Sequence, residues 1–314
     1  DQVGGLAVFR SGIARIQDHW KRPLSLYTLP DRFRLSALPD QALAAALAAA
    51  ARHKVIDDDA SAALRGAGQP DGIVFPQIGD ERWVEYAVKD IAQMQSDTGC
   101  TCVYLDVFPY FSHLPCQDGS TTLSASLHMA KAMREALPDD VVFWSEYALT
   151  DVASQFADGC HHYYFLDLNE TFARPYNRTD RAPDVFMDMP MTLQRFTLPR
   201  YRLVDLPAYI EAGNCPSQID AAFVNAEMFT ENTYRIHPSR MRAKINRGDA
   251  VKRRYPDCFR TDTPAPRVPT AAEGLVANHF PGDGRDAWTI YSGRPRTYSG
   301  VVLSVPHRTG ATYR

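Results

Sequence analysis

The second quarter of the chain carries the clearest pattern of hydrophobic and polar positions. Residues 80–96 and 120–137 place apolar side chains three or four positions apart, which is typical of amphipathic helices. Residues 102–108 and 141–146 are nearly continuous apolar runs, which is typical of strands buried on both faces of a parallel sheet. A shorter apolar run at 72–76 precedes them. This alternation of strands and helices predicts an α/β fold with a parallel sheet.

Weaker signals of the same kind cover the rest of the first 262 residues. Further helices are expected at 39–52 and 239–255, and a polar loop at 57–72. Further strands are expected at 24–29, 161–166, 185–189, 202–206 and 221–227. Residues 1–262 are therefore predicted to form a (β/α)8 TIM-type barrel, complete or incomplete, because the part before residue 70 is short for the first strands.

The pattern changes after residue 262. Prolines at 264, 266 and 269 predict a linker. Short strands separated by glycine turns are expected at 275–280, 287–292, 297–305 and 310–312. Residues 263–314 are thus predicted to form a small antiparallel, β-sandwich-like unit that is truncated, and its apolar side chains are expected to be buried. These side chains are Trp288, Ile290, Val302 and Leu303.

Composition excludes several classes of function. The chain has 314 residues, a net charge of −3 and 45% hydrophobic residues, so it is an ordinary globular sequence and no general polyanion binder. We expect no nucleic-acid partner, because the basic helix at 239–255 has an apolar side and is better explained as a solvated helix face. No run of 18 apolar residues exists, so no membrane span is expected. The amino terminus lacks a basic segment followed by an apolar one, so a signal peptide is either absent or removed.

Cofactor and metal motifs are also missing. Six cysteines are too sparse for a disulfide framework, and no paired Cys and His spacing indicates zinc. Cys116 and Cys160 fall in expected loops, and a disulfide between them stays open. The sequence holds no GxSxG elbow and no phosphate-binding GKS or GKT loop. We therefore expect neither a metal nor a cofactor.

Two carboxylates mark the candidate chemistry. Asp106 and Glu146 close two very apolar strands in consecutive βα units, at the edge where α/β folds carry their sites. Neighbouring strands lie about 4.8 Å apart, so we expect the carboxyl groups roughly 5 to 6 Å apart. That spacing is typical of a retaining glycosidase, with Asp106 as the ionised nucleophile and Glu146 as the protonated general acid. The alternative is structural, with either carboxylate capping a helix or forming an ion pair.

Aromatic residues crowd both strand ends and are the predicted sugar-binding surfaces. Four of them are assigned to the substrate: Tyr104, Tyr110, Trp144 and Tyr147. Sugar rings stack on aromatic faces, although ordinary core packing would also place aromatic residues there.

Further candidates come from the second half of the chain. Asn225 and Glu227 end the expected strand 221–227 and offer groups for sugar hydroxyls, and Glu227 is an alternative general acid. Of the neighbouring His161 and His162 at most one reaches the site, because side chains alternate along a strand, and His162 is assigned to the substrate. Arg195 is a candidate to bind the substrate or to orient a carboxylate, and the alternative, which the sequence favours, is an ordinary surface arginine.

These segments resemble glycoside-hydrolase barrels. Residues 83–106, with Gly99-Cys100-Thr101-Cys102-Val103-Tyr104-Leu105-Asp106, are similar to the fourth-strand region of the α-amylase superfamily, and residues 141–146 are similar to the fifth. Residues 274–313 are similar to the β-domain that follows such barrels. The resemblance implies an Asp nucleophile after strand four and a Glu acid/base after strand five, in a bacterial barrel family related to these enzymes. The chain departs from α-amylases at Tyr104, where they carry an arginine, and in lacking their later His-Asp pair.

The sequence thus predicts a retaining glycoside hydrolase that acts on an oligo- or polysaccharide. A non-catalytic carbohydrate-binding or scaffold protein, on a barrel that has lost its activity, is the alternative. A hydrolase or lyase of another kind that uses the same acidic edge is a third hypothesis.

Overall fold

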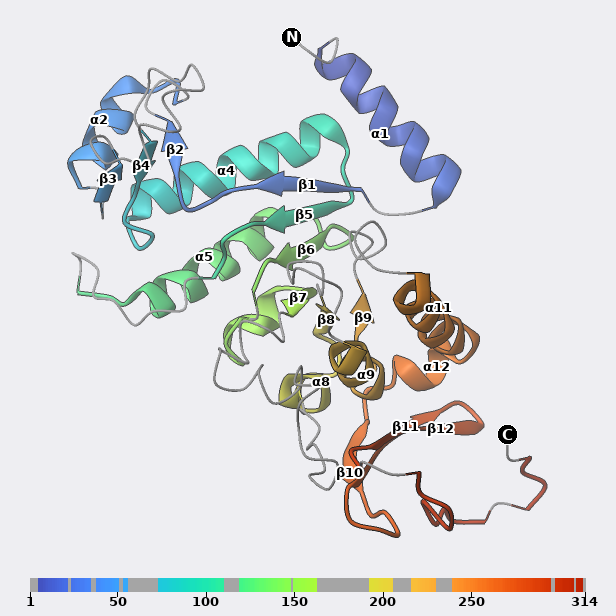
Figure 1. Cartoon of the computed structure of the whole chain (residues 1–314). Coiled ribbons are helices and arrows are strands. Elements are labelled where there is room, and N and C mark those ends of the chain that lie inside the picture. The colour runs from blue at the N-terminus through green and yellow to red at the C-terminus, as the bar shows by residue number, and fades with distance from the viewer. Residues whose placement is uncertain are drawn as a thin grey trace. The chain divides into compact units, whose positions relative to one another are not determined.

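A computed structural model describes most of the chain. The described residues are 5–21, 24–34, 38–50, 53–55, 73–109, 119–147, 149–162, 192–205, 216–229, 239–294, 297–307 and 309–312. The chain divides into two compact units, Asp1–His161 and His162–Arg314, and each is described by itself (Figure 1).

Parallel strands form the centre of the first unit. They are β1 (Ser25–Thr28), β5 (Cys102–Leu105), β6 (Val142–Ser145) and β7 (Gly159–His162), in that order across the sheet. The register pairs the last residues of β1, β5 and β6, so the carboxyl ends of these strands lie level. The strands expected at 24–29, 102–108 and 141–146 are therefore confirmed as parallel neighbours, although β5 ends at Leu105, three residues before the expected end.

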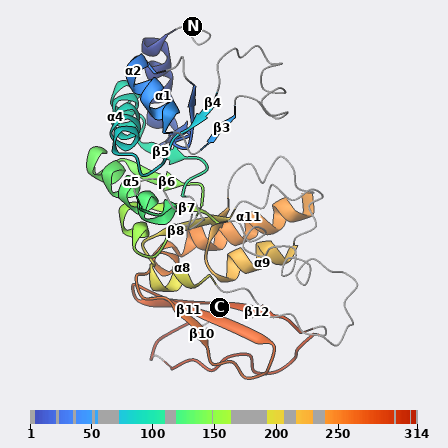
Figure 2. The ribbon, with the colours of Figure 1, turned by 90° about the vertical axis from the view of Figure 1, so that its left-hand side faces the viewer.

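Helices α4 (Glu81–Thr98) and α5 (Thr122–Ala136) connect these strands and pack against each other. The carboxylate of Asp80 accepts a hydrogen bond from the amide of Arg82 at the start of α4, and Gly99 ends the helix at a φ of 70°. Figure 2 shows both helices along one face of the sheet. The two helices expected from the sequence are thus confirmed, within two residues at each end.

A small antiparallel sheet belongs to the same unit. Strands β2 (Phe33–Arg34) and β3 (His53–Val55) both pair with β4 (Ile73–Phe75) in antiparallel fashion. Residues 72–76 were expected to join the parallel sheet, and that expectation is wrong. A short apolar run does not show which strand it pairs with. Residues 53–55, which form β3, directly follow the helix expected at 39–52 and were not expected to form a strand.

Two further α-helices belong to the first unit, besides the short 3₁₀ helix Ala153–Phe156. Helix α2 (Gln41–Ala49) is shorter than the one expected at 39–52, and Asp40 caps it. Helix α1 (Leu6–Trp20) was missed by the sequence prediction, although Leu6, Phe9, Ile13, Ile16 and Trp20 recur every three or four positions, as in an amphipathic helix. Ile13 is its one buried residue and joins a core cluster with Leu26 of β1 and Cys100.

The second unit contains a parallel pair and several helices. Strands β8 (Arg202–Asp205) and β9 (Met228–Phe229) pair in parallel. Its helices are α8 (Leu193–Thr197), α9 (Pro216–Val224), α11 (Ser239–Arg254) and α12 (Pro256–Phe259). The expected strand 202–206 and the expected helix 239–255 are confirmed, whereas residues 163–166 and 185–189 lie outside the described residues.

The strand expected at 221–227 is wrong. Residues 221–224 are the last turn of α9, and a turn at Asn225 and Ala226 leads into β9. A short apolar run fits a buried helix as well as a buried strand. Pro216, which occupies the first position of α9, was the feature of the sequence that indicated the start of a helix.

The antiparallel unit at the end of the chain consists of β10 (Ala265–Val268), β11 (Leu275–Gly282) and β12 (Arg285–Ser292), in that order. Gly284 makes the hairpin turn between β11 and β12 at a φ of 68°. Strand β10 lies within the expected proline linker. It can contain Pro266 because it is an edge strand, where a residue without a backbone N–H is acceptable. The strands expected at 297–305 and 310–312 are wrong, because the described residues there form no strand.

One face of this sheet packs on α9 and α12. Phe280 is fully buried against Phe259, and the side chains of Asn278 and Thr289 donate to the Val224 carbonyl at 3.0 and 2.6 Å. Ile290, which the sequence placed on the buried face, points the other way and is 46% exposed.

A pair of substitutions tests this packing. We expect Phe280→Ala to lower the free energy of unfolding by about 3–5 kcal/mol, because it leaves a cavity at the Phe259 contact. Ile290→Ser, on the exposed face, should change it by no more than about 0.5 kcal/mol. Urea unfolding followed by circular dichroism measures both, and equal losses would show that the wrong face has been assigned to the core.

Candidate active site

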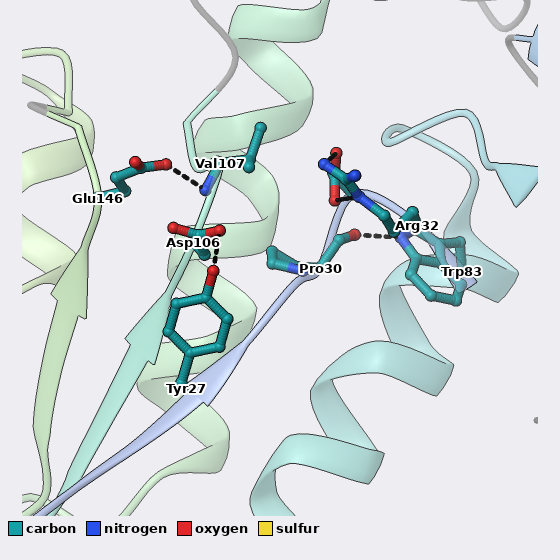
Figure 3. Close-up of polar contacts among 8 residues, drawn as sticks. Tyr27, Pro30, Arg32, Trp83, Asp106, Val107 and Glu146 are labelled. Atoms are coloured by element: carbon teal, nitrogen blue, oxygen red, sulfur yellow. Dashed lines mark hydrogen bonds and ion pairs between the residues drawn. The ribbon is translucent and has the colours of Figure 1, made fainter. Parts of the chain in front are cut away.

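Asp106 and Glu146 extend the parallel sheet by one residue beyond β5 and β6. The amide of Asp106 donates to the Thr28 carbonyl at 2.8 Å, and the amide of Glu146 donates to the Leu105 carbonyl at 2.9 Å. Because the strands end level, both half-buried side chains leave the same edge of the sheet from neighbouring strands (Figure 3). The structure thus brings together the two carboxylates that the sequence singled out.

Val107 holds Glu146 beside the end of β5. Its amide donates to Glu146 Oε2 at 2.6 Å, so Glu146 is tied to the residue that follows Asp106 (Figure 3). Val107 has a φ of 51°, a left-handed conformation that a β-branched residue rarely adopts. A strained backbone of this kind is a common feature of functional sites, and here it accompanies the bond between the two strand ends.

Two tyrosine hydroxyls reach Asp106, one on each carboxylate oxygen. Tyr27 of β1 donates to Oδ2, and Tyr104 of β5 donates to Oδ1 at 3.4 Å. Their rings lie 5.5 Å apart with a tilt of 31°, and Figure 3 shows the Tyr27 hydroxyl directed at Asp106. Tyr27 is 63% exposed, so this contact lies at the open edge of the sheet rather than in the core.

His161 of β7 continues the contacts across the sheet. Its Nδ1 lies 3.4 Å from the Tyr104 hydroxyl, and its ring packs 5.0 Å from Tyr104 and 6.3 Å from Trp144. Burial lowers the pKa of His161 from 6.5 to about 4, although the nearby Asp106 opposes this shift. The imidazole is therefore neutral at pH 7 and contributes hydrogen bonding rather than charge.

The loop after β1 is held beside Asp106 by α4. Trp83 Nε1 donates to the Pro30 carbonyl at 3.0 Å, and Arg32 pairs with the buried Asp31 at 2.7 Å (Figure 3). Hydrogen bonding to Asp31 raises the pKa of Arg32, and the Asp106 charge acts in the same direction. The loop thus supplies a cation near the carboxylates without pairing it directly to them.

The sequence-derived substrate residues of the first unit have different outcomes. Tyr104 and Trp144 lie in the cluster around His161, and the amide of Tyr147 donates to the Phe108 carbonyl at 2.9 Å, next to the site. Tyr110 lies outside the described residues, as does the side chain of His162. A substrate role for these residues stays a prediction.

Tyr27 and His161 are the site residues that sequence reasoning missed. Tyr27 stands two positions before the end of the strand expected at 24–29, and His161 was set aside in favour of its neighbour. Listing reactive side chains on every expected strand, rather than on the two most apolar ones, would have found both.

The remaining candidates, Arg195, Asn225 and Glu227, are buried in the second unit. Arg195 of α8 is 2% exposed, donates through Nη2 to the Phe259 carbonyl at 2.9 Å and lies over the Phe280 ring. Burial lowers its pKa to about 10. Asn225 and Glu227 are buried in the turn that precedes β9, so the argument that they end a strand does not apply.

Metal-binding groups, cysteines and membrane-spanning helices are considered next. Among the described residues, no group of three or more His, Cys, Asp or Glu side chains could hold a metal ion. Cys160 is buried, and its expected partner Cys116 lies outside the described ranges. None of the helices in the described part of the chain is long and apolar enough to cross a bilayer.

Comparisons with known proteins give matches among solved structures alone: no family model and no curated protein matches the chain. An α-N-acetylgalactosaminidase from Bifidobacterium bifidum is 14% identical, with a TM-score of 0.58 over 93% of this chain and 45% of its own. A maltogenic α-amylase from Thermotoga neapolitana is 9% identical, with a TM-score of 0.55 over 92% of this chain and 69% of its own.

The chain also covers 51% of an α-galactosidase from Thermus thermophilus, at 14% identity and a TM-score of 0.43 over 83% of this chain. It therefore spans about half the length of some of the enzymes it matches. At these identities the likeness concerns the fold alone. The chain has an α/β fold of the glycoside-hydrolase kind, with a parallel sheet and two separate three-stranded antiparallel sheets.

Proposed function

We propose that the protein is a retaining glycoside hydrolase of the barrel type, with Asp106 as nucleophile and Glu146 as general acid and base. One observation carries the proposal: two carboxylates leave the same sheet edge from neighbouring parallel strands, and the Val107 amide holds Glu146 at the end of β5. The glycosidase-like fold and the aromatic residues beside the carboxylates support it.

The first step forms a covalent intermediate. A lone pair of Asp106 attacks the anomeric carbon, the bond from that carbon to the glycosidic oxygen breaks, and the leaving oxygen takes a proton from Glu146. Glu146 Oε2 accepts the Val107 hydrogen bond, and the carboxyl group has to be protonated for this step. The second step reverses these roles, because Glu146 takes a proton from water as the water attacks and Asp106 leaves as a carboxylate.

An α-linked hexopyranoside is the substrate class we propose. The solved structures with TM-scores above 0.5 include an α-N-acetylgalactosaminidase and α-amylases. Tyr104, Trp144 and the exposed Tyr27 supply aromatic surface at the carboxylate edge. Tyr147 and His162 are proposed as further contacts to the sugar.

The stereochemistry of the product tests the proposal. The protein is incubated with p-nitrophenyl α-glycosides of galactose, N-acetylgalactosamine and glucose, and the first-formed anomer is read by proton NMR. We expect release of p-nitrophenol and an α-anomer as the first product. Hydrolysis that yields the β-anomer would refute the retaining assignment. Saturable sugar binding without any turnover would favour the non-catalytic carbohydrate-binding protein instead.

A further inference from the structure

The two oxygens of Asp106 are held unequally. Tyr27 donates to Oδ2 in the closer of the two contacts, whereas Tyr104 is 3.4 Å from Oδ1, near the outer limit of a hydrogen bond. Tyr104 also faces His161 Nδ1 at 3.4 Å, so its hydroxyl is shared between two neighbours. Oδ2 is therefore the anchored oxygen, and Oδ1 is the one available to a substrate.

We infer that Tyr27 is a positioning residue for the second half of the reaction, in which Asp106 is released from the sugar. The inference rests on the proposed function and adds a role for a residue on a different strand. Oδ1 forms the bond to the anomeric carbon, and Oδ2 becomes the carbonyl oxygen of the resulting ester. The Tyr27 hydroxyl stays on Oδ2 throughout.

The strength of this hydrogen bond changes along the reaction. An ester carbonyl is a weaker acceptor than a carboxylate, since charge-assisted hydrogen bonds are roughly twice as strong as neutral ones. When water attacks the anomeric carbon, the bond from that carbon to Oδ1 breaks and its electron pair returns to Asp106. Negative charge then grows on Oδ2 opposite the Tyr27 hydroxyl. The contact is therefore stronger in this transition state than in the intermediate, which is the condition for acceleration.

The surroundings of Tyr27 suit this role. Its ring packs on Tyr104, and its strand is fixed to β5 by the hydrogen bond from the Asp106 amide to the Thr28 carbonyl. The same backbone contact thus sets the position of Asp106 relative to the strand that carries Tyr27. Loss of the hydroxyl alone should leave the ring packing and the sheet in place.

The experiment compares Tyr27→Phe with the unaltered protein on 2,4-dinitrophenyl α-glycosides, whose good leaving group makes release of the sugar the slow step. We expect kcat to fall about 10- to 100-fold, with KM falling in parallel and kcat/KM changing less than threefold. Intact-protein mass spectrometry of quenched reactions should show the glycosyl-enzyme accumulating. Tyr86→Phe, the same change on helix α4, is the matched control and should alter none of these values.

The outcomes separate this inference from the proposed function. Failure of the unaltered protein to turn over any of the glycosides, or to form a covalent adduct, would remove the proposed function and this inference with it. Normal turnover by the unaltered protein with kcat of Tyr27→Phe within twofold, and no accumulated adduct, would overturn the inference alone. A Tyr27→Phe protein with a lowered melting temperature and a raised KM would show a structural role and also overturn it.

Discussion

Asp106→Asn is expected to lose at least about 10⁴-fold in kcat while the protein stays folded. The amide has the shape of the carboxylate but cannot act as the nucleophile. The backbone contacts of residue 106 to β1 do not involve the side chain, so the sheet should be retained. Turnover of p-nitrophenyl α-glycosides and the melting temperature are the two measurements.

Asp140→Asn provides the matched control, because Asp140 is exposed in the turn after α5 and carries the same chemical change. It should leave both measurements unaltered. A melting temperature that drops sharply for Asp106→Asn, with activity largely kept, would make Asp106 a structural residue.

Glu146→Gln should affect substrates according to their leaving groups. A 2,4-dinitrophenolate leaves without a proton, so the first step on such glycosides should be nearly unchanged, whereas ordinary glycosides should lose about 10²- to 10⁴-fold in kcat/KM. Measuring kcat/KM on a series of aryl glycosides whose leaving groups differ in acidity shows whether the loss grows as the leaving group becomes poorer. Glu135→Gln, an exposed change on α5, is the control.

Azide extends the same test to the second step. A small anion can attack the glycosyl-enzyme without base assistance, so azide should partly restore turnover by Glu146→Gln. The glycosyl azide should keep the anomeric configuration of the substrate. An azide product of inverted configuration, or equal losses on good and poor leaving groups, would argue against Glu146 as the acid and base.

The parallel sheet and its two carboxylates could be predicted from the sequence because their signals are local. Each strand is a continuous apolar run that ends at one carboxylate, and each is followed or preceded by a helix with clear caps and an apolar stripe. Consecutive βα units place such strands side by side with their carboxyl ends level. Asp106 and Glu146 thus became neighbours by rules that need no knowledge of distant residues.

The contacts that complete the site depend on distant residues. Tyr27 meets Asp106 across 79 positions and Tyr104 meets His161 across 57, and only the register of the sheet decides these pairs. The errors in the second unit have another cause. Residues 221–224 are apolar enough for either a helix or a strand, and residues 297–305 have a strand-like composition but form no strand.

Covalent capture of the nucleophile tests the central claim most directly. The protein is treated separately with 2-deoxy-2-fluoro glycosyl fluorides and with 5-fluoro glycosyl fluorides of the galactose and glucose series. It is then digested, and the modified peptide is mapped by tandem mass spectrometry. Our account predicts one added sugar per chain, carried as an ester on Asp106 and missing in Asp106→Asn. A sugar found on another residue, or no adduct under conditions in which the protein hydrolyses p-nitrophenyl glycosides, would contradict it.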